Sequence, residues 1–287
     1  MRLATGEVTC LTCDEPGNNR RPAPNREGSV VLFDSDRYAT WRHPGNTELQ
    51  LLNTTAAARG VPSRRITYSP GPDERPLFAP AANTLAWSRG EGGRYRVVSG
   101  GLVSGHGSLQ VGGTGTLGDG GSEWLAPLAW SPDARTLAFS RGNPLGPAAI
   151  AAIDPATERE VPLGDSVAVP GSLSFNADGG WYALASARRA EPAGLLPGAL
   201  GFALASTAPF RGPATYRGTR VVVGPVDGEA LEVDLGETAD WGWPTGLSLH
   251  PDGTRFVLGQ RREAAASEAD GSGGTERIVA VALDCPE

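Results

Sequence analysis

One short segment recurs five times along the 287 residues, and each copy reads as a strand, a polar turn and a second strand. Such a repeat constrains the fold strongly, because every copy must build the same supersecondary unit. Two copies show the turn most clearly, as Ser131-Pro132-Asp133 and His250-Pro251-Asp252-Gly253. Proline presets one backbone angle, aspartate bonds its own backbone, and glycine accepts a left-handed conformation. We therefore expect five β-hairpins, at residues 23–33, 78–87, 130–139, 175–184 and 249–258.

A further strand candidate follows each hairpin. Large apolar residues two apart, such as Leu137 with Phe139, have the period of strands with two differently packed faces. Third strands are expected at residues 49–52, 95–98, 149–153, 220–223 and 277–282, and a fourth in several units, for example at 230–235. Four antiparallel strands per repeat form a propeller blade. The sequence thus predicts an all-β fold, a single β-propeller domain over residues 1–287 with five blades.

Two stretches rich in glycine interrupt the repeat. The widest interval between copies contains Glu191-Pro192-Ala193-Gly194 and continues to Arg217. We interpret it as a long loop insertion at about residues 187–218 within blade four, with an unrecognised sixth blade as the alternative. The second stretch, residues 100–121, is dominated by Gly, Ser and Thr, and is expected to be loop-like with a short fourth strand.

The Ser-Pro-Asp and His-Pro-Asp-Gly turns precede apolar strands that end in Ser-Arg or Gln-Arg, and in this they resemble the TolB-like, WD-type β-propeller repeat. The resemblance covers nearly the whole chain. It implies a non-catalytic module that binds a protein or peptide at one propeller face, and an extracytoplasmic location. Because residues 1–7 lack the apolar core of a secretion signal, we expect a periplasmic or extracellular protein if an upstream signal precedes this chain, and a cytoplasmic one otherwise.

Charge and hydropathy weigh against several partners. The net charge is −7 and the pI is about 5.1, whereas nucleic-acid binding needs a cationic surface. No apolar run is long enough to span a bilayer. We expect no nucleic-acid partner, no membrane insertion, no cofactor and a monomer, and a small anionic ligand stays open beside a protein or peptide partner.

The chain ends carry the three cysteines, Cys10, Cys13 and Cys285. The last repeat ends before a fourth strand can form, and residues 8–11 precede the first repeat, so this N-terminal strand is expected to complete the last blade. Cys285 would then approach the other cysteines, which predicts a disulfide to Cys10 or Cys13. The Cys10-Leu11-Thr12-Cys13 spacing also suits a redox motif or a zinc half-site, but a second ligand pair is missing, so no metal site is predicted.

An arginine follows the second strand of every repeat unit, on the face where the acidic linkers are expected. In a structural interpretation, each arginine pairs with a linker carboxylate and fixes blade spacing, which we favour for Arg89 and Arg141. In a ligand-binding interpretation, the arginines line an axial funnel for a peptide end or a small anion, and Arg37 is the better candidate. The arginines are Arg37, Arg89, Arg141, Arg188 and Arg261, and the linker carboxylates are Asp14, Glu15, Asp73, Glu74, Glu123, Asp165 and Asp240.

Aromatic side chains gather in predicted loops on the same side. Each could simply cover a blade, or together they could rim a binding face of the kind enriched in interfaces. At least two are expected to be partly exposed. The loop residues are Trp41, His43, Trp124, Trp241 and Trp243, while Trp87, Trp130 and Trp181 fall on predicted strands and are expected in the core.

Catalysis has little support in the sequence. No Gly-x-Ser-x-Gly precedes a predicted helix, and no helix follows the run Gly112-Gly113-Thr114-Gly115. The enzymatic alternative is a carbohydrate-binding or glycoside-hydrolase-like five-bladed propeller, which needs paired carboxylates at the starts of the inner strands. Those starts read Pro76-Leu77-Phe78, Pro127-Leu128-Ala129-Trp130 and Gly171-Ser172-Leu173, without a carboxylate, so we predict no catalytic residues.

Overall fold

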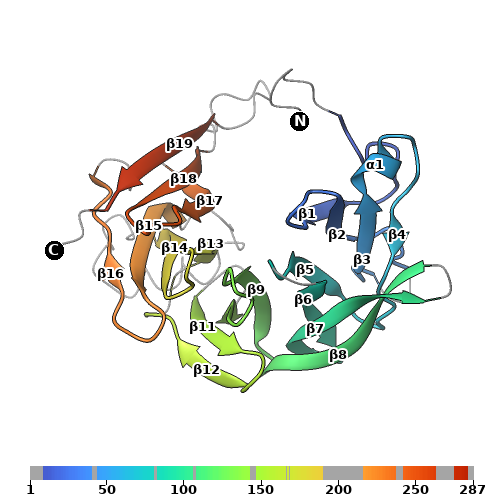
Figure 1. Cartoon of the computed structure of the whole chain (residues 1–287), viewed down its shortest axis with the longest axis horizontal. Coiled ribbons are helices and arrows are strands. Elements are labelled where there is room, and N and C mark those ends of the chain that lie inside the picture. The colour runs from blue at the N-terminus through green and yellow to red at the C-terminus, as the bar shows by residue number, and fades with distance from the viewer. Residues whose placement is uncertain are drawn as a thin grey trace, which may run out of the picture. The chain divides into compact units, whose positions relative to one another are not determined.

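The computed structural model describes residues 9–40, 44–80, 83–105, 108–142, 147–165, 167, 169–189, 216–236, 242–262 and 275–283. Within these residues, nineteen strands form five sheets, and α1 (Thr54–Ala57) is the only helix (Figure 1). The strands of each sheet follow one another in sequence, which is the meander of a propeller blade. The predicted all-β fold with five blades is confirmed.

The first two sheets have four strands each, in sequence order. Sheet 1 contains β1 (Asn19–Pro24), β2 (Val30–Ser35), β3 (Glu48–Asn53) and β4 (Arg64–Arg65). Sheet 2 contains β5 (Asp73–Phe78), β6 (Thr84–Glu91), β7 (Arg94–Gly105) and β8 (Ser108–Gly121). Asn53 ends β3 and caps α1, because its Oδ1 accepts a hydrogen bond of 2.9 Å from the Ala56 amide.

The other three sheets repeat the pattern, the last with one strand fewer. Sheet 3 contains β9 (Trp124–Trp130), β10 (Leu137–Gly142), β11 (Ala148–Asp154) and β12 (Arg159–Pro162). Sheet 4 contains β13 (Val169–Phe175), β14 (Trp181–Arg189), β15 (Tyr216–Pro225) and β16 (Leu231–Glu232). Sheet 5 contains β17 (Trp243–Leu249), β18 (Arg255–Arg262) and β19 (Thr275–Ala282).

The same backbone hydrogen bond closes the hairpin at the start of every sheet. In each case the amide of residue i donates to the carbonyl oxygen of residue i+5. The bonds measure 2.8 to 3.0 Å and join Asn25 to Val30, Ala79 to Thr84, Ser131 to Thr136, Asn176 to Trp181 and His250 to Arg255. The five predicted hairpins are therefore present.

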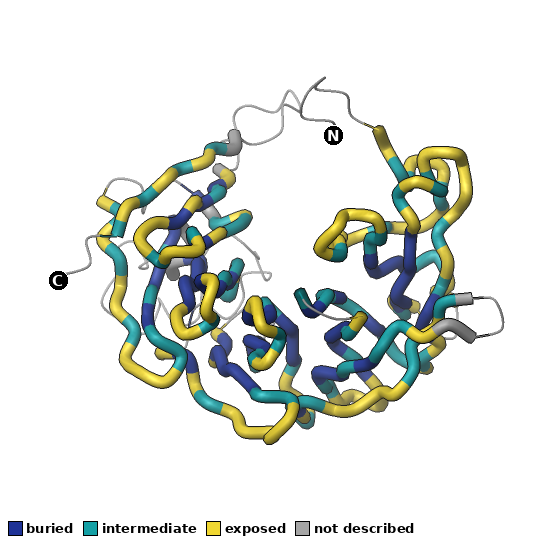
Figure 2. The backbone as a smooth tube through the Cα atoms, in the orientation of Figure 1, coloured by how far each residue is buried: buried dark blue, intermediate teal, exposed yellow. Residues whose placement is uncertain are grey.

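The chain divides into two compact units, and sheet 3 contributes to both. Unit 1 comprises Met1–Arg141 with Ala151–Glu160, and unit 2 comprises Gly142–Ile150 with Val161–Glu287. Burial is concentrated in the strands of each unit, and the turns are exposed (Figure 2). Each buried Leu or Phe side chain contributes about 1.5–3 kcal/mol relative to exposure in water.

Successive sheets pack face to face within each unit. In unit 1, Leu32 and Leu49 of sheet 1 pack with Trp87 of sheet 2, and Val97 of sheet 2 packs with Phe139 of sheet 3. In unit 2, the apolar residues of sheets 4 and 5 form one further cluster, which includes Ala183, Ala185, Val221, Leu249, Phe256 and Leu258. This stacking explains why the strands carry apolar residues on both faces.

The glycine-rich stretch over residues 100–121 is not a loop, as the sequence suggested, but most of a long two-stranded ribbon, β7 with β8. Backbone hydrogen bonds hold a ladder together whatever the side chains are, and here glycine is needed for close packing. A Cβ on Gly100 would lie 2.7 Å from Val111 Cγ1, and one on Gly112 would lie 2.8 Å from Val103 Cγ2. The loop prediction is wrong because these glycines make room for neighbouring side chains within the ribbon.

The predicted N-terminal strand and the predicted bridge to Cys285 are not formed in the described part of the chain. Thr9–Leu11 belong to no strand, Val8 lies outside the described residues, and sheet 5 has only β17, β18 and β19. Cys10 instead forms a disulfide with Cys13, so the bridge to Cys285 is wrong. A disulfide between residues three apart in sequence requires a turn, which an extended strand cannot provide.

Three further observations concern the predicted insertion, the strand tryptophans and possible membrane spans. The predicted insertion falls where β14 joins β15, and its residues 190–215 lie outside the described residues. Trp87 and Trp130 are buried as predicted, but Trp181 at the start of β14 is 47% exposed, which corrects its assignment to the core. No helix in the described residues is long and apolar enough to cross a membrane.

Candidate functional site

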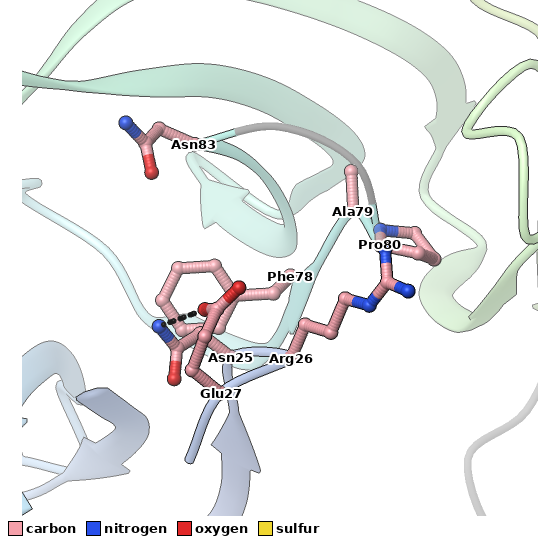
Figure 3. Close-up of a pocket in the computed structure, with 7 residues that line it drawn as sticks. All are labelled: Asn25, Arg26, Glu27, Phe78, Ala79, Pro80 and Asn83. Carbon is pink, nitrogen blue, oxygen red and sulfur yellow. Dashed lines mark hydrogen bonds between the residues drawn. The ribbon is translucent and has the colours of Figure 1, made fainter. Parts of the chain in front are cut away.

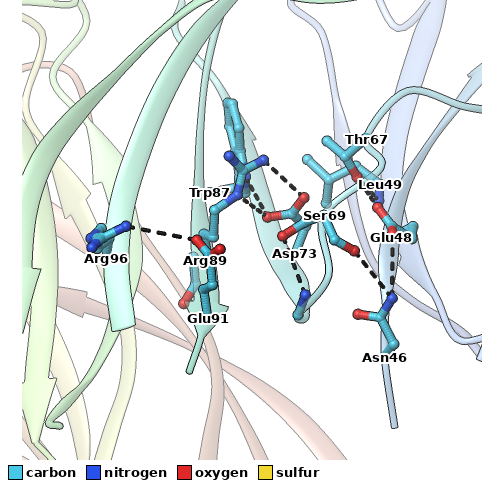
Figure 4. A network of polar contacts seen from close by, with 12 residues as sticks. Asn46, Glu48, Leu49, Thr67, Ser69, Asp73, Trp87, Arg89, Glu91 and Arg96 are labelled. Atoms are coloured by element: carbon cyan, nitrogen blue, oxygen red, sulfur yellow. Dashed lines mark hydrogen bonds and ion pairs between the residues drawn. The ribbon is translucent and has the colours of Figure 1, made fainter. Parts of the chain in front are cut away.

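Arg89, one of the predicted arginines, is part of a polar network between sheets 1 and 2 of unit 1 (Figure 4). Its Nε and Nη2 donate to the two oxygens of Asp73, at 2.7 and 3.0 Å, and Trp87 Nε1 donates to Asp73 Oδ1 at 2.9 Å. The Asp73 carboxylate is fully buried. The hydrogen bonds to Asp73 raise the pKa of Arg89, which stays charged. The sequence correctly placed Arg89 beside Asp73, but Asp73 lies on β5 rather than in a linker, directly opposite Arg89 on β6, so this ion pair joins two strands of sheet 2.

A second buried carboxylate lies beside this pair. Glu48 accepts hydrogen bonds from Thr67 Oγ1, at 2.6 Å, and from Arg65 Nη2. Burial raises the pKa of Glu48, and these two partners oppose the shift. The Asp73 amide donates to the Thr47 carbonyl at 2.9 Å, so the start of β3 is joined directly to the start of β5. The network fixes the spacing of two blades and leaves little free for a ligand.

Arg37, which the sequence favoured for ligand capture, is enclosed. Its side chain is 7% exposed, and its donors bond Glu15, Ser35 and Asn19. Glu15 also accepts from the Ser63 amide and Ser63 Oγ, each at 2.6 Å. Burial alone would raise the pKa of Glu15, but the hydrogen bonds from Ser63 and Arg37 outweigh it and the pKa is lowered. Arg37 therefore anchors the segment that leads into β1.

The remaining predicted arginines lie on β10, β14 and β18. Arg141 Nη2 lies 3.0 Å from Glu160 Oε2 on β12, rather than beside a linker carboxylate. Arg261 is exposed on β18, where its backbone lies opposite Trp243 and Glu276. Arg188 lies on β14, and its side chain is outside the described residues.

Trp124 is the one predicted loop aromatic whose side chain lies in the described part of the chain. Trp124 begins β9 and is half-buried. Trp41, His43 and Trp241 lie outside the described residues, and Trp243 is described only by its backbone in β17. The aromatic-rimmed face thus stays a prediction, with Trp124 as its described member.

The structure brings together a cluster that the sequence did not predict as a group, although Glu74 and Trp124 were among the candidates. We call it the first-strand cluster: Arg21, Asp34, Glu74, Arg75 and Trp124 of unit 1. Arg21 Nη1 lies 3.1 Å from Asp34 Oδ2 and 2.9 Å from Glu74 Oε2. The Arg75 amide donates to the same Asp34 oxygen at 3.0 Å. The cluster therefore links β1 and β2 of sheet 1 to β5 of sheet 2.

The backbone at the two arginines is unusual and repeats between blades. Arg21 and Arg75 have φ values of +52° and +54°, and each precedes a proline. Both lie where the register with the next strand shifts, between Arg20 and Ala23 in β1 and between Glu74 and Leu77 in β5. Non-glycine residues in the left-handed region carry a cost of order 1–3 kcal/mol and concentrate at functional sites. The bulges direct two arginine side chains into one region.

Arg75 stacks on Trp124 and has donors to spare. Its guanidinium carbon lies 4.6 Å from the centre of the Trp124 ring. Among the described residues no group accepts a hydrogen bond from its side chain, and its Nε is buried without a partner. Arg75 as a whole is half-buried. Desolvation by burial lowers its pKa from the ordinary arginine value, and it remains a cation.

Asp34 has a buried oxygen that accepts no hydrogen bond from the described residues. Its side chain is 1% exposed, and its Oδ1 has no hydrogen-bond partner in the described residues, although Oδ2 has two. Desolvation raises the pKa of Asp34, while the Arg75 amide and the Arg21 charge oppose the shift. The two arginines and two carboxylates balance in charge, so Arg75 supplies hydrogen-bond donors rather than a large net field.

One pocket, of about 280 Å³, lies beyond the ends of β1 and β5 (Figure 3). It is lined by the hairpin turns that follow these strands, including Asn25, Glu27 and Phe78. Asn25 Nδ2 donates to Glu27 at 3.0 Å and to Ser29 at 3.1 Å, so the polar groups mainly close their own turn. Across the described residues, no three His, Cys, Asp or Glu side chains are placed to hold a metal ion.

One signal in the sequence could have found the first-strand cluster. Arg21-Pro22 and Arg75-Pro76 occur at the same distance before the hairpin-closing amides of Asn25 and Ala79. The sequence predicts that this strand starts at Pro76, whereas β5 begins at Asp73 and so includes the carboxylates of Asp73 and Glu74. Contact with Trp124 depends on how the sheets pack, which no local pattern encodes.

The five sheets define a β-propeller fold, and solved structures of TolB-like propeller proteins share it. TolB from Acinetobacter baumannii matches 91% of this chain and 51% of its own, at 13% identity and a TM-score of 0.56. This chain therefore spans about half the length of that protein. A putative TolB from Agrobacterium tumefaciens matches 94% of this chain and 78% of its own, at 15% identity and a TM-score of 0.56.

An enzyme also has this fold. An oligogalacturonate lyase in complex with manganese matches 98% of this chain and 70% of its own, at 14% identity and a TM-score of 0.55. No protein-family model and no curated sequence matches the chain. Identities this low show the fold alone, so function has to be argued from the site.

Proposed function

We propose that this protein is a non-catalytic propeller module that binds a protein or peptide, and that the first-strand cluster receives an acidic group of that partner. The observation that carries the proposal is the Arg75 guanidinium, which is held against Trp124 and lacks an acceptor among the described residues. A guanidinium binds a carboxylate through two parallel hydrogen bonds. Stacking on the ring holds the guanidinium in place before binding, which reduces the entropy lost on association.

The composition of the cluster also fits an interface. Trp and Arg are enriched among residues that dominate binding energies, and both are half-buried here. The Arg21 side chain is 31% exposed and pairs with Glu74, the residue next to Arg75. It therefore places a second guanidinium in the same region. The Cys10–Cys13 disulfide supports an extracytoplasmic location, because disulfides persist mainly in oxidising compartments.

The carbohydrate-binding or glycoside-hydrolase alternative has weaker support. Asp34 and Glu74 form a carboxylate pair, as such an enzyme requires. However, one guanidinium nitrogen of Arg21 bonds both, and Asp34 is 1% exposed and cannot reach a sugar ring without rearrangement. The binding module is therefore the better interpretation.

The test is a screen of synthetic peptides that carry a free C-terminal carboxylate or an internal Asp or Glu, each beside its neutral amide analogue. We expect acidic members to bind and Arg75→Ala to weaken them about tenfold to a hundredfold, the loss of a charge-assisted bidentate contact. Trp124→Ala should weaken the same peptides, because it frees the guanidinium to move.

The control variant is Arg94→Ala, which removes an exposed arginine of the same unit that pairs with Asp119. It should bind the peptides as the wild type does. If acidic and neutral peptides bind equally, or Arg94→Ala matches Arg75→Ala, the proposed site is wrong.

A further inference from the structure

We propose that Cys10 and Cys13 form a reversible thiol–disulfide exchange site whose reaction partner is a dithiol. The two cysteines are joined to each other and separated by Leu11 and Thr12. Both are exposed. An exchange reaction needs a thiolate to approach one sulfur of the disulfide, so exposure is its first requirement.

The disulfide does little to hold the fold. The entropy that a cross-link removes from the unfolded chain grows with the length of the loop that it closes, and this loop contains two intervening residues. A bridge to Cys285 would have closed nearly the whole chain and would have been a structural staple. The observed bridge is local and can open without releasing a distant part of the chain.

Other contacts anchor the segment independently of the disulfide. Glu15 is bound by Arg37 and by the amide and hydroxyl of Ser63, and the Glu15 and Arg37 side chains are 8% and 7% exposed. Asn18 donates to both oxygens of Asp36, at 2.8 and 2.6 Å. These bonds begin two residues after Cys13, so β1 keeps its place when the disulfide opens.

The reaction balances with a dithiol as the reductant. One thiolate of the dithiol attacks Cys10 or Cys13, the sulfur–sulfur bond breaks, and the electron pair passes to the other cysteine, which takes a proton. The second thiol of the reductant then attacks the mixed disulfide and releases the second cysteine as a thiol. The dithiol is oxidised to a disulfide, and Cys10 with Cys13 gains two electrons and two protons.

The experiment uses the full chain with Cys285→Ser, which leaves two cysteines, and dithiothreitol as the probe. The folded protein is equilibrated in buffers of defined reduced-to-oxidised dithiothreitol ratio, and free thiols are alkylated and counted by mass. We expect full and reversible reduction without denaturant, at a rate within about tenfold of the rate in denaturant. The thermal unfolding transition should stay cooperative in both redox states.

A second variant keeps the result decisive. Cys10→Ser with Cys13→Ser in the same background has no thiols, and it should fold and melt as the reduced protein does. The proposal is overturned if reduction requires denaturant or abolishes cooperative unfolding. It is also overturned if no disulfide forms in oxidising buffer, or if the double variant does not fold.

Discussion

Replacing Arg89 with alanine should be among the most destabilising single changes in unit 1. The substitution leaves Asp73, whose side chain is wholly buried, with Trp87 Nε1 as its remaining strong donor. Removing one partner of a buried ion pair costs about 3–5 kcal/mol, because the other charge stays uncompensated. Arg89 is itself 25% exposed, so Asp73→Asn, which leaves an arginine that water can reach, should cost less, about 1.5–3 kcal/mol.

The pH dependence gives this prediction a distinct signature. Burial raises the pKa of Asp73, and Arg89 is the main group that opposes the rise. In Arg89→Ala the folded pKa rises further above the unfolded value near 3.8, so the folded state binds a proton more tightly. The deficit relative to wild type should be largest above the folded pKa and shrink as the pH falls toward the unfolded value.

Urea unfolding followed by tryptophan fluorescence, at neutral pH and at mildly acidic pH, measures both effects. Arg94→Ala is the matched control, because its partner Asp119 is exposed, and it should leave the midpoint unchanged. A loss below about 1 kcal/mol for Arg89→Ala would place the pair among weak surface contacts. A deficit that grows on acidification would refute the reasoning about the buried carboxylate.

Two further changes test other parts of the fold. Glu15→Gln should destabilise the protein above pH 4.5, and the effect should disappear as the pH falls through the folded pKa of Glu15, because that pKa is lowered. Urea titrations at several pH values measure this, and equal destabilisation at all of them would contradict it. Gly71→Ala should lower the melting temperature by several degrees, because the new Cβ would lie 1.8 Å from the Gly90 carbonyl oxygen. The control is Gly246→Ala, whose Cβ would meet nothing within 4 Å and which should leave the melting temperature unchanged.

Local chemistry explains how much of the fold the sequence could predict. Each hairpin is closed by a bond across a few residues, so Ser131-Pro132-Asp133 or His250-Pro251-Asp252-Gly253 carries its own turn geometry. The ribbon over residues 100–121 was missed because Gly100 and Gly112 serve contacts with side chains on other positions. The predicted bridge to Cys285 is wrong because closing the two-residue gap between Cys10 and Cys13 costs far less chain entropy than closing nearly the whole chain.

The first-strand cluster was harder to predict from the sequence than the hairpins. Arg21 and Arg75 occupy equivalent bulges, and the Arg-Pro pairs mark them, but their meeting with Asp34 and Trp124 comes from three different sheets. Arg37 was favoured because acidic and aromatic residues surround it in sequence. In the fold those neighbours do not decide its contacts, and Glu15, twenty-two positions away, does.

A double-mutant cycle on one acidic peptide tests the central claim most directly. Binding is measured for wild type and Arg75→Ala, each with the peptide and with its analogue in which the carboxylate is replaced by an amide. If Arg75 holds that carboxylate, the two changes are not additive, and the coupling is about 1.5 kcal/mol or more, equivalent to about tenfold in affinity. Additive effects, with each change weakening binding independently of the other, would contradict the account.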